Sequence, residues 1–372
     1  MIEIEQNDFK DLFKIFEEVK WELSSFSVLG GNNPGRVFIS SDSDKTSAFM
    51  MTPEGWLLAG NPEDKEFNKE LKQLFENDIL RNYEDDFEIY FLPKWEKVAE
   101  EIFSAHPLFK YKRYHYKAFL KELDIADEKS GILGKIQQIN SDFVKSNLTM
   151  KNMDSVDEWI LNNWGTYENF EKKGFGFYIL KNNIVLSWSV ADCVYKDACE
   201  IGIHTDEAHR KQGLAVRTVN AMLKYAKDNA FSEVGWQCGA TNIGSYKTAE
   251  KCGFKRMKEY FGYTGSTDKN EHYFGLILDN LFLAHDVKKS KEIFKNLDSD
   301  VEFKNYQHYD IACGFAENGE KDFAFQNLKV AIKKGFNHKR HIMNDEDLST
   351  LRDSEEWNEI MELLNDAKRW ES

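Results

Sequence analysis

Hydrophobic positions follow two rhythms along the first third of the chain, one typical of helices and one typical of strands. Apolar residues spaced three and four apart predict a helix over 6–22, and a second helix over 61–75 has Pro62 in a first-turn position. Short apolar runs bounded by turn residues predict strands at 36–40, 48–51, 56–59 and 87–92, with a further helix at 94–104. This mixture is typical of an α/β or α+β unit.

The middle third repeats the mixture with sharper boundaries. Apolar runs at 175–180 and 184–191 predict a hairpin. The helix predicted over 211–228 has a single apolar face, made of Ala215, Val219, Met222, Leu223 and Ala226. Other strands are predicted at 136–139, 199–205 and 234–238, a helix at 155–163, and a helix at 243–252 that Gly253 closes before a last strand from Phe254.

Beyond a polar boundary at 265–271 the pattern turns helical. We expect helices at 274–284, 287–296, 305–317, 320–334 and 354–368. Small residues at Ala312, Ala324 and Ala331 would let two of these helices approach closely, which resembles a tetratricopeptide repeat. This tail, 273–372, is expected to bind a peptide of a protein partner or, alternatively, to pack on the rest of the chain or on a second copy.

The charge balance excludes some classes of function. The chain has 372 residues, with 49 basic and 64 acidic ones, so its formal net charge is −15. Non-specific nucleic-acid binding depends on Lys and Arg that neutralise phosphates, so an acidic chain argues against it. No apolar run approaches the roughly 18 residues that span a membrane, and the first residues lack the basic and apolar regions of a signal peptide. We therefore expect neither a nucleic-acid partner nor a membrane partner.

The cysteines and one basic segment add two further expectations. Five cysteines without a paired spacing predict neither a disulfide framework nor a zinc site, so we expect a reducing, cytoplasmic location and no metal. The basic and aromatic run KYKRYHYK at 110–117 is expected to be a solvated stretch that joins two halves of the chain. The alternative is a contact with an anion or a nucleotide.

One loop in the middle third has the features of a phosphate site. A predicted strand ends near Thr205, and Arg210-x-x-Gly213-x-Ala215 then leads into the long helix. A helix start offers unpaired N–H groups and a partial positive charge, and a glycine without a Cβ lets a phosphate approach the backbone. Arg210 would add a positive charge. The loop is neither a Walker loop nor a G-x-G-x-x-G motif.

This loop and the residues after it resemble the GNAT superfamily of acyl-CoA N-acyltransferases. That family has Q/R-x-x-G-x-G/A between a strand and a helix, and then an Asn that opens the next helix and a Gly-Phe that closes it. Arg210, Gly213 and Ala215 match the first motif, and Asn242 and Gly253-Phe254 match the second. The wider pattern EIGIHT…HRKQGLA…WQC…N…GF is similar to the subgroup that includes the zwittermicin A resistance acetyltransferases.

The resemblance implies an α+β fold built on the mixed β-sheet of the GNAT acyltransferases, in tandem. A degenerate N-terminal lobe would span 1–128, since no phosphate cradle occurs in it, and a catalytic lobe would span 129–267. The helical, tetratricopeptide-like tail 273–372 would follow. The ligand implied is acetyl-CoA as cosubstrate. Its binding positions would be Ile203, His204, Thr205, Arg210, Lys211, Gln212, Gly213, Leu214, Ala215, Asn242 and Ser245, with the backbone of 211–215 on the diphosphate and the strand residues and Asn242 on pantetheine.

The reaction that follows from this resemblance needs a base. An amine like that of Lys has a pKa of about 10, so its proton must leave before it attacks a thioester. Glu200 is the first candidate, with a salt-bridged or edge-exposed glutamate as the alternative. His204 is the second, with a histidine on the far side of the sheet as the alternative. Many members of that family have a Tyr acid where this chain has Ala249, which leaves the acid unassigned. Tyr246, one turn earlier, is the candidate, with a core or rim aromatic as the alternative, and Tyr260 and Tyr263 come later in the chain.

The predicted function is therefore an acetyl-CoA-dependent N-acetyltransferase that acts directly on an amine of a small molecule such as an antibiotic-like aminopolyol. Ala249 and the helical tail leave two alternatives open. One is a catalytically weak CoA sensor or scaffold that recruits a protein partner through 273–372. The other is acetyl transfer to a protein or peptide amine that the tail selects. The negative charge suits cationic acceptors of any size.

Overall fold

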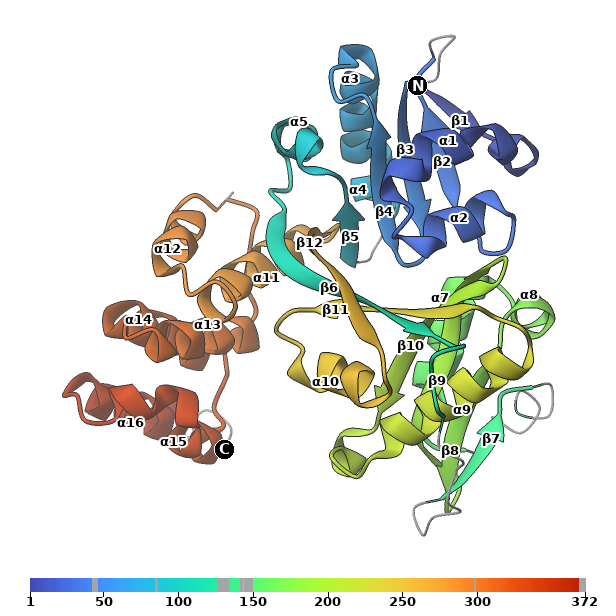
Figure 1. Cartoon of the computed structure of the whole chain (residues 1–372). Coiled ribbons are helices and arrows are strands. Elements are labelled where there is room, and N and C mark those ends of the chain that lie inside the picture. Colours follow the sequence, from blue (N-terminus) through green and yellow to red (C-terminus); the bar gives the residue numbers. More distant parts are fainter. Residues whose placement is uncertain are drawn as a thin grey trace. The chain divides into compact units, whose positions relative to one another are not determined.

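The computed structural model describes residues 1–41, 46–83, 86–125, 134–140, 143, 150–297 and 299–367. The chain divides into two compact units. The larger unit comprises 1–75, 88–102 and 110–264, and the smaller one comprises 76–87, 103–109 and 265–372. In Figure 1 the blue, green and yellow parts are mixed strands and helices, and the orange and red part is helical. The three-part division expected from the sequence stays a prediction.

A single mixed sheet runs through the described strands in the order β1-β2-β3-β4-β5-β12-β6-β11-β10-β9-β8-β7. The first half of the sheet contains β1 (Ile2–Ile4), β2 (Arg36–Ile39), β3 (Ser47–Thr52), β4 (Gly55–Gly60) and β5 (Asp86–Tyr90). The second half contains β7 (Lys135–Gln138), β8 (Gly176–Lys181), β9 (Ile184–Tyr195), β10 (Ala198–Thr205) and β11 (Glu233–Gly239). Two long strands, β6 (Phe109–Phe119) and β12 (Lys255–Ser266), lie between the halves.

The two halves repeat one plan. Antiparallel strands lead to a parallel pair, β4 with β5 in the first half and β10 with β11 in the second. A helix follows the first strand of each pair, α3 (Lys65–Leu74) and α9 (Leu214–Asp228). The strand that comes next in each half then crosses over, since β6 lies beside β11 and β12 lies beside β5. The tandem α+β fold expected from the sequence is confirmed.

The remaining helices of the larger unit mostly agree with the predicted pattern. They include α1 (Phe13–Phe16), α2 (Leu23–Leu29), α5 (Glu96–Ile102), α7 (Asp154–Trp164), α8 (Tyr167–Lys173) and α10 (Ile243–Lys251). The helix expected over 6–22 is divided into short turns, although its apolar face is buried. The predicted face of α9 is confirmed at Val219, Met222, Leu223 and Ala226, each at most 1% exposed.

Helix α2 was not predicted, because three of its five buried residues are serines. Ser24, Ser25 and Ser27 are each at most 1% exposed. Their hydroxyls find partners inside the protein; Ser25 donates to the carbonyl of Glu22 at 2.8 Å, and Ser27 to the carbonyl of Val194 at 2.7 Å. Such bonds satisfy the hydroxyls, so a hydrophobic period is not needed to bury this helix. The last of them joins α2 to β9.

The basic run at 110–117 is not a solvated stretch. It forms most of β6, which pairs antiparallel with β11 from Phe119↔Glu233 to Arg113↔Gly239. Strand alternation turns every second side chain to one face of the sheet, so His115 is only 2% exposed while Lys112 remains exposed. The expectation failed because charge density alone does not reveal a strand in the middle of a sheet.

The smaller unit contains helices α4 (Leu80–Asn82), α11 (Lys269–Phe282), α12 (Val287–Lys295), α13 (Asn305–Glu317), α14 (Lys321–Lys333), α15 (Lys339–Asn344) and α16 (Glu356–Ala367). A short turn joins α13 to α14, and Ala312, Ala324 and Ala331 are fully buried there. The closely packed helix pair is therefore present, and its likeness to a tetratricopeptide repeat stays a prediction. In the part of the chain described, no helix has the length and apolar character to cross a membrane.

Candidate active site

Strands β10 and β11 part in the middle of the second half-sheet. They pair only from Ala198↔Glu233 to Glu200↔Gly235, although β10 continues to Thr205 and β11 to Gly239. The predicted pantetheine positions, Ile203 to Thr205, lie on the part of β10 that has left β11. Strand edges that face such a gap can pair with an extended ligand.

The loop after β10 leaves backbone donors open. Lys211 and Gly213 both have a left-handed backbone, with φ of 62° and 80°. No side chain caps α9 at Gly213. Among the described residues, the N–H groups of Lys211, Gln212, Gly213, Leu214 and Ala215 have no protein acceptor. A Cβ built on Gly213 would meet nothing within 4 Å, so the space in front of these donors is open. The loop therefore fits a diphosphate.

The equivalent loop of the first half-sheet is closed. There the side chain of Asp64 accepts a hydrogen bond from the N–H of Phe67 at 3.0 Å. Pro62 has no N–H, and the N–H of Glu63 donates to the side chain of Asn61 at 3.1 Å. The Asp64 carboxylate at this helix start already accepts a hydrogen bond from a backbone N–H group, and its negative charge would repel a phosphate. This explains physically why the first half lacks a cradle.

Arg210 ties the open loop back to the strand. Its Nε donates to the carbonyl of Thr205 at 3.2 Å, and its Nη1 contacts Glu207 Oε1 at 3.0 Å. Its side chain is 55% exposed. A bound diphosphate would compete with Glu207 for this guanidinium.

Glu200 lies where the two strands separate, and it is buried. Only 5% of the residue is exposed, and Gln237 Nε2 donates to both of its carboxylate oxygens at 3.2 Å. Gly235 opposite makes room, because a Cβ there would lie 2.6 Å from Glu200 Cγ. Burial raises the pKa of Glu200 well above its usual range, and the nearby Glu22 raises it further. These contacts exclude an edge-exposed glutamate.

Glu22 shares the same amide and was not found from the sequence. It precedes α2, is 2% exposed, and both of its oxygens accept from Gln237 Nε2 at 3.0 Å. Burial raises its pKa to about 7. The hydroxyl of Tyr260 in turn donates to Gln237 Oε1, and Arg113 Nε donates to Tyr260 at 3.0 Å. A polar network therefore connects the two half-sheets at Glu200.

Two further carboxylates belong to this cluster. Asp192 is the additional residue of a β-bulge in β9 beside Glu200 and Ile201. It is 4% exposed, and Trp159 Nε1 donates to it at 2.7 Å. Glu54 lies between β3 and β4, and burial raises its pKa to about 7. Burial also raises the pKa of Asp192, and the negative charge of Glu54 adds to this effect.

His204 lies on the same face of β10 as Glu200. Residues that are two or four positions apart in a strand lie on the same face. A strand rises about 3.3 Å per residue, so His204 and Glu200 are about 13 Å apart along β10. The His204 ring stacks on Trp188 with centroids 5.8 Å apart. Partial burial lowers the pKa of His204, so it is neutral at pH 7. It is exposed, unlike Glu200.

The predicted residues of α10 have local roles at the start of the helix. Asn242 Oδ1 caps α10 by accepting from the N–H of Ser245 at 3.0 Å, and Ser245 Oγ accepts from Trp236 Nε1 at 3.0 Å. The ring of Tyr246 is half-buried against Tyr114, with centroids 5.9 Å apart. Ala249, at the position where the resemblance implies a tyrosine, is fully buried in the core.

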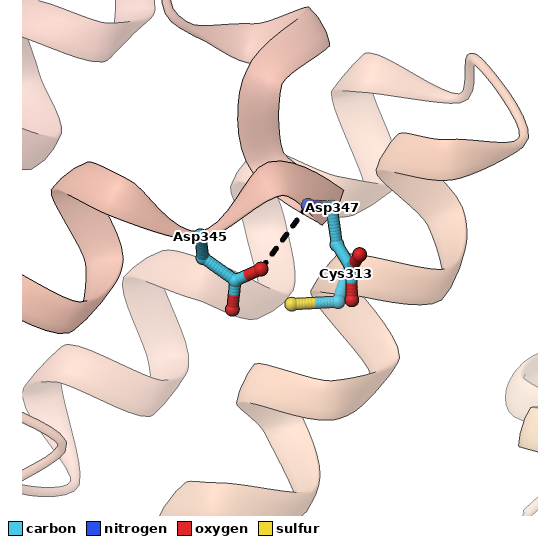
Figure 2. A group of neighbouring side chains, drawn as sticks. All are labelled: Cys313, Asp345 and Asp347. Atoms are coloured by element: carbon cyan, nitrogen blue, oxygen red, sulfur yellow. Dashed lines mark hydrogen bonds between the residues drawn. The ribbon is translucent and has the colours of Figure 1, made fainter. Parts of the chain in front are cut away.

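One group of potential metal ligands lies in the helical unit. Ligand atoms of Cys313, Asp345 and Asp347 lie within 4.8 Å of one another (Figure 2). Asp345 caps the short helix after it by accepting from the backbone N–H of Asp347 at 3.1 Å, and it also accepts from the hydroxyl of Tyr309 in α13 at 2.6 Å. Burial raises the pKa of the Cys313 thiol, so it remains protonated and is a poor ligand. This cluster is therefore structural.

A sequence signal existed for part of the missed cluster. Asp192 is the only carboxylate within β9, whose other members are apolar or small, and a lone acid in a buried strand needs a partner. Glu22 and Glu54 lie in short connections with no comparable pattern. Arg113 and His115 were hidden in the run interpreted as a solvated surface.

Comparisons with known proteins cover the larger part of the chain. The family model described as GNAT acetyltransferase matches residues 14–263. A Bacillus subtilis (strain 168) protein named N-acetyltransferase YdfB is 25% identical over 267 residues, which is 70% of this chain and 97% of that protein. A crystal structure of a GCN5-related N-acetyltransferase-like protein from Streptococcus suis 89/1591 has a TM-score of 0.51 at 19% identity, covering 69% of this chain and 98% of its own.

Proposed function

Because this chain belongs to the GNAT acetyltransferase family, we propose that it is an acetyl-CoA-dependent N-acetyltransferase that modifies an amine of a small molecule. The resemblance found in the sequence is thus confirmed at the level of the family. The zwittermicin A resistance subgroup and the tetratricopeptide likeness of the tail stay predictions. The observation that carries the proposal is the open helix start at Gly213, which lies beside a gap that begins at a buried carboxylate.

Acetyl-CoA would supply the activated acetyl group. The backbone N–H groups of 211–215 would hold its diphosphate, and Gly213 leaves the approach open. The free edge of β10 at Ile203, His204 and Thr205 would align the pantetheine arm by backbone pairing. Asn242 and Ser245 would line the path of the pantetheine arm at the start of α10, in addition to the hydrogen bonds that they make there.

Glu200 would accept the proton of the incoming ammonium. An ordinary glutamate has a pKa of about 4.3, far below the value of about 10 for an alkylamine. Burial raises the pKa of Glu200, which narrows this difference and makes the carboxylate a stronger base near neutral pH. Gln237 holds both oxygens and fixes the carboxylate at the strand separation. His204, exposed and neutral, is the second candidate base.

The leaving thiolate needs little help from an acid. A free thiol has a pKa of about 8.5, so a thiolate is a weak base and leaves without obligatory protonation. This agrees with Ala249 in the core at the position where relatives have a tyrosine. Tyr246 would be an auxiliary acid from the same helix.

The open loop provides the decisive test. We expect Gly213→Glu to abolish CoA binding in calorimetry and acetyl-CoA consumption with an amine panel, because a carboxylate would lie where the diphosphate binds. Gly319→Glu is the matched control, since Gly319 also has a left-handed φ, 76°, and open space around its Cβ position. Absence of CoA binding by the wild-type protein would refute the proposal.

A further inference from the structure

We propose that the acceptor carries at least two ammonium groups, held by carboxylates that both half-sheets contribute. Glu22 and Glu54 come from the first half, and Asp192 and Glu200 come from the second. This inference rests on the proposed function and specifies its acceptor. It gives the first half-sheet a role in recognising the acceptor even though that half has lost its cradle.

The carboxylates exceed what the protein's own donors satisfy. The side-chain amide of Gln237 has two hydrogens, and the Ser24 hydroxyl donates one more to Glu22 Oε1 at 3.3 Å, yet four carboxylate oxygens of Glu22 and Glu200 lie within 3.2 Å of the Gln237 nitrogen. A neutral amide also brings no positive charge that would stabilise the ionised forms of these two buried groups, and burial accordingly raises the pKa of both. A ligand ammonium has three donors and a full charge, so it supplies what this arrangement lacks.

The nearby cations are mostly committed elsewhere. Arg113 Nη1 binds both oxygens of Glu88 at 2.9 and 2.7 Å, and Lys117 pairs with Glu233. Lys258 interacts electrostatically with Glu22, and its Nζ lies 3.2 Å from the ring centroid of Trp21. Arg113 also acts electrostatically on Glu22 and Glu54, and Lys117 on Glu200, so each of these cations is shared with another partner. Four carboxyl groups surrounded by cations that already have other partners favour an acceptor with two or more positive charges rather than one.

Two buried polar atoms beside the carboxylates have no protein partner. His115 is 2% exposed, and its Nε2 has no hydrogen bond and lies 3.7 Å from Glu200 Oε1. Burial lowers the pKa of His115 to about 4, so this imidazole is neutral and can accept. Asn163 is 3% exposed, interacts with Glu54 through its side chain, and has no partner for Oδ1. Both atoms suit a ligand that only donates, as an ammonium does.

The experiment compares 1,4-diaminobutane with butylamine, which has the same length and one charge fewer. We expect kcat/KM of the full-length protein with acetyl-CoA to be at least about tenfold higher for the diamine, through KM. Glu54→Gln and Glu22→Gln should each raise KM for the diamine at least about tenfold and leave CoA binding unchanged. Glu63→Gln, at an exposed residue in the loop after β4, is the matched control and should change KM for neither amine.

The outcomes separate this inference from the proposed function. Turnover that is equal for both amines, or a diamine KM that Glu54→Gln and Glu22→Gln leave unchanged, overturns the inference and leaves the transferase intact. If the wild-type protein binds no CoA, the transferase proposal fails. The inference about the acceptor can then still be tested by calorimetry of the two amines with the protein alone. Tighter binding of the diamine that weakens in Glu54→Gln supports the acidic site, and equal or absent binding refutes it.

Discussion

Glu22 and Glu200, which are 178 positions apart in the chain, accept hydrogen bonds from one side-chain nitrogen, Gln237 Nε2, at 3.0 and 3.2 Å. Glu22 directly precedes α2 in the first half, and Glu200 ends the paired part of β10. The amide fixes the distance between two buried carboxylates that would otherwise repel each other. The geometry of the candidate base therefore depends on a residue from the opposite half of the sheet.

Removing this amide should destabilise the fold. Gln237→Leu would leave two buried carboxylates without their shared donor, and hydrogen bonds to charged groups contribute about 1.5–3 kcal/mol each. We expect the free energy of unfolding at pH 7.5 to fall by about 3 kcal/mol, measured by denaturant titration. Gln138→Leu, at an exposed position of β7, is the control and should stay close to wild type. If the free energy of unfolding of Gln237→Leu equals that of the wild type, the carboxylates are already satisfied without the amide.

Stability should decrease as the pH rises toward neutrality. The pKa of Glu22 is about 7 in the folded protein, raised from 4.5 by burial. Between these values the folded state keeps a proton that the unfolded chain releases, so this contribution is present at low pH and is lost as the pH approaches 7. At about 1.4 kcal/mol per pKa unit, the loss amounts to about 3 kcal/mol. Denaturation curves from pH 4.5 to 8 would reveal it, and Glu22→Gln should flatten the slope while Glu63→Gln retains it.

The acid side of the pH–rate profile should identify the base. Because burial and then Glu22 raise the pKa of Glu200, kcat/KM should fall as the pH drops through a value well above the ordinary glutamate range. Glu22→Gln removes a negative charge beside Glu200, so the fall should move to lower pH. His204→Gln should leave unchanged the pH at which kcat/KM falls. If His204→Gln shifts or removes this fall in kcat/KM and Glu22→Gln does not shift it, then His204 is the general base.

The parts of this site that the sequence predicted are local. The apolar face of α9 repeats with the helical period, and the glycine at its start occurs where the chain needs a left-handed φ, so both leave a pattern within a few residues. The paired strands on either side were found for the same reason. These features set the cradle and the gap, which are the basis of the family resemblance.

The acidic cluster left almost no such pattern, because pairing between distant segments creates it. Glu22 reaches the site through α2, whose buried serines conceal the helix, and Asp192 reaches it through a bulge that depends on strand register. The exchange of β6 and β12 between the half-sheets brings Arg113 and Tyr260 into the same network. A linear sequence shows each of these residues but not their proximity.

The lack of a side chain at position 235 is required by Glu200. A Cβ on Gly235 would lie 2.6 Å from Glu200 Cγ and 2.9 Å from its Oε1, so Gly235→Ala must displace the carboxylate. Overpacking of this kind costs about 1–3 kcal/mol, and a displaced base should lower kcat at least about tenfold while CoA binding remains. Gly275→Ala is the matched control, since a Cβ there meets nothing within 4 Å and alanine favours its helix. Steady-state kinetics and thermal melting of both variants would decide, and a fully active Gly235→Ala would show that Glu200 need not hold this position during turnover.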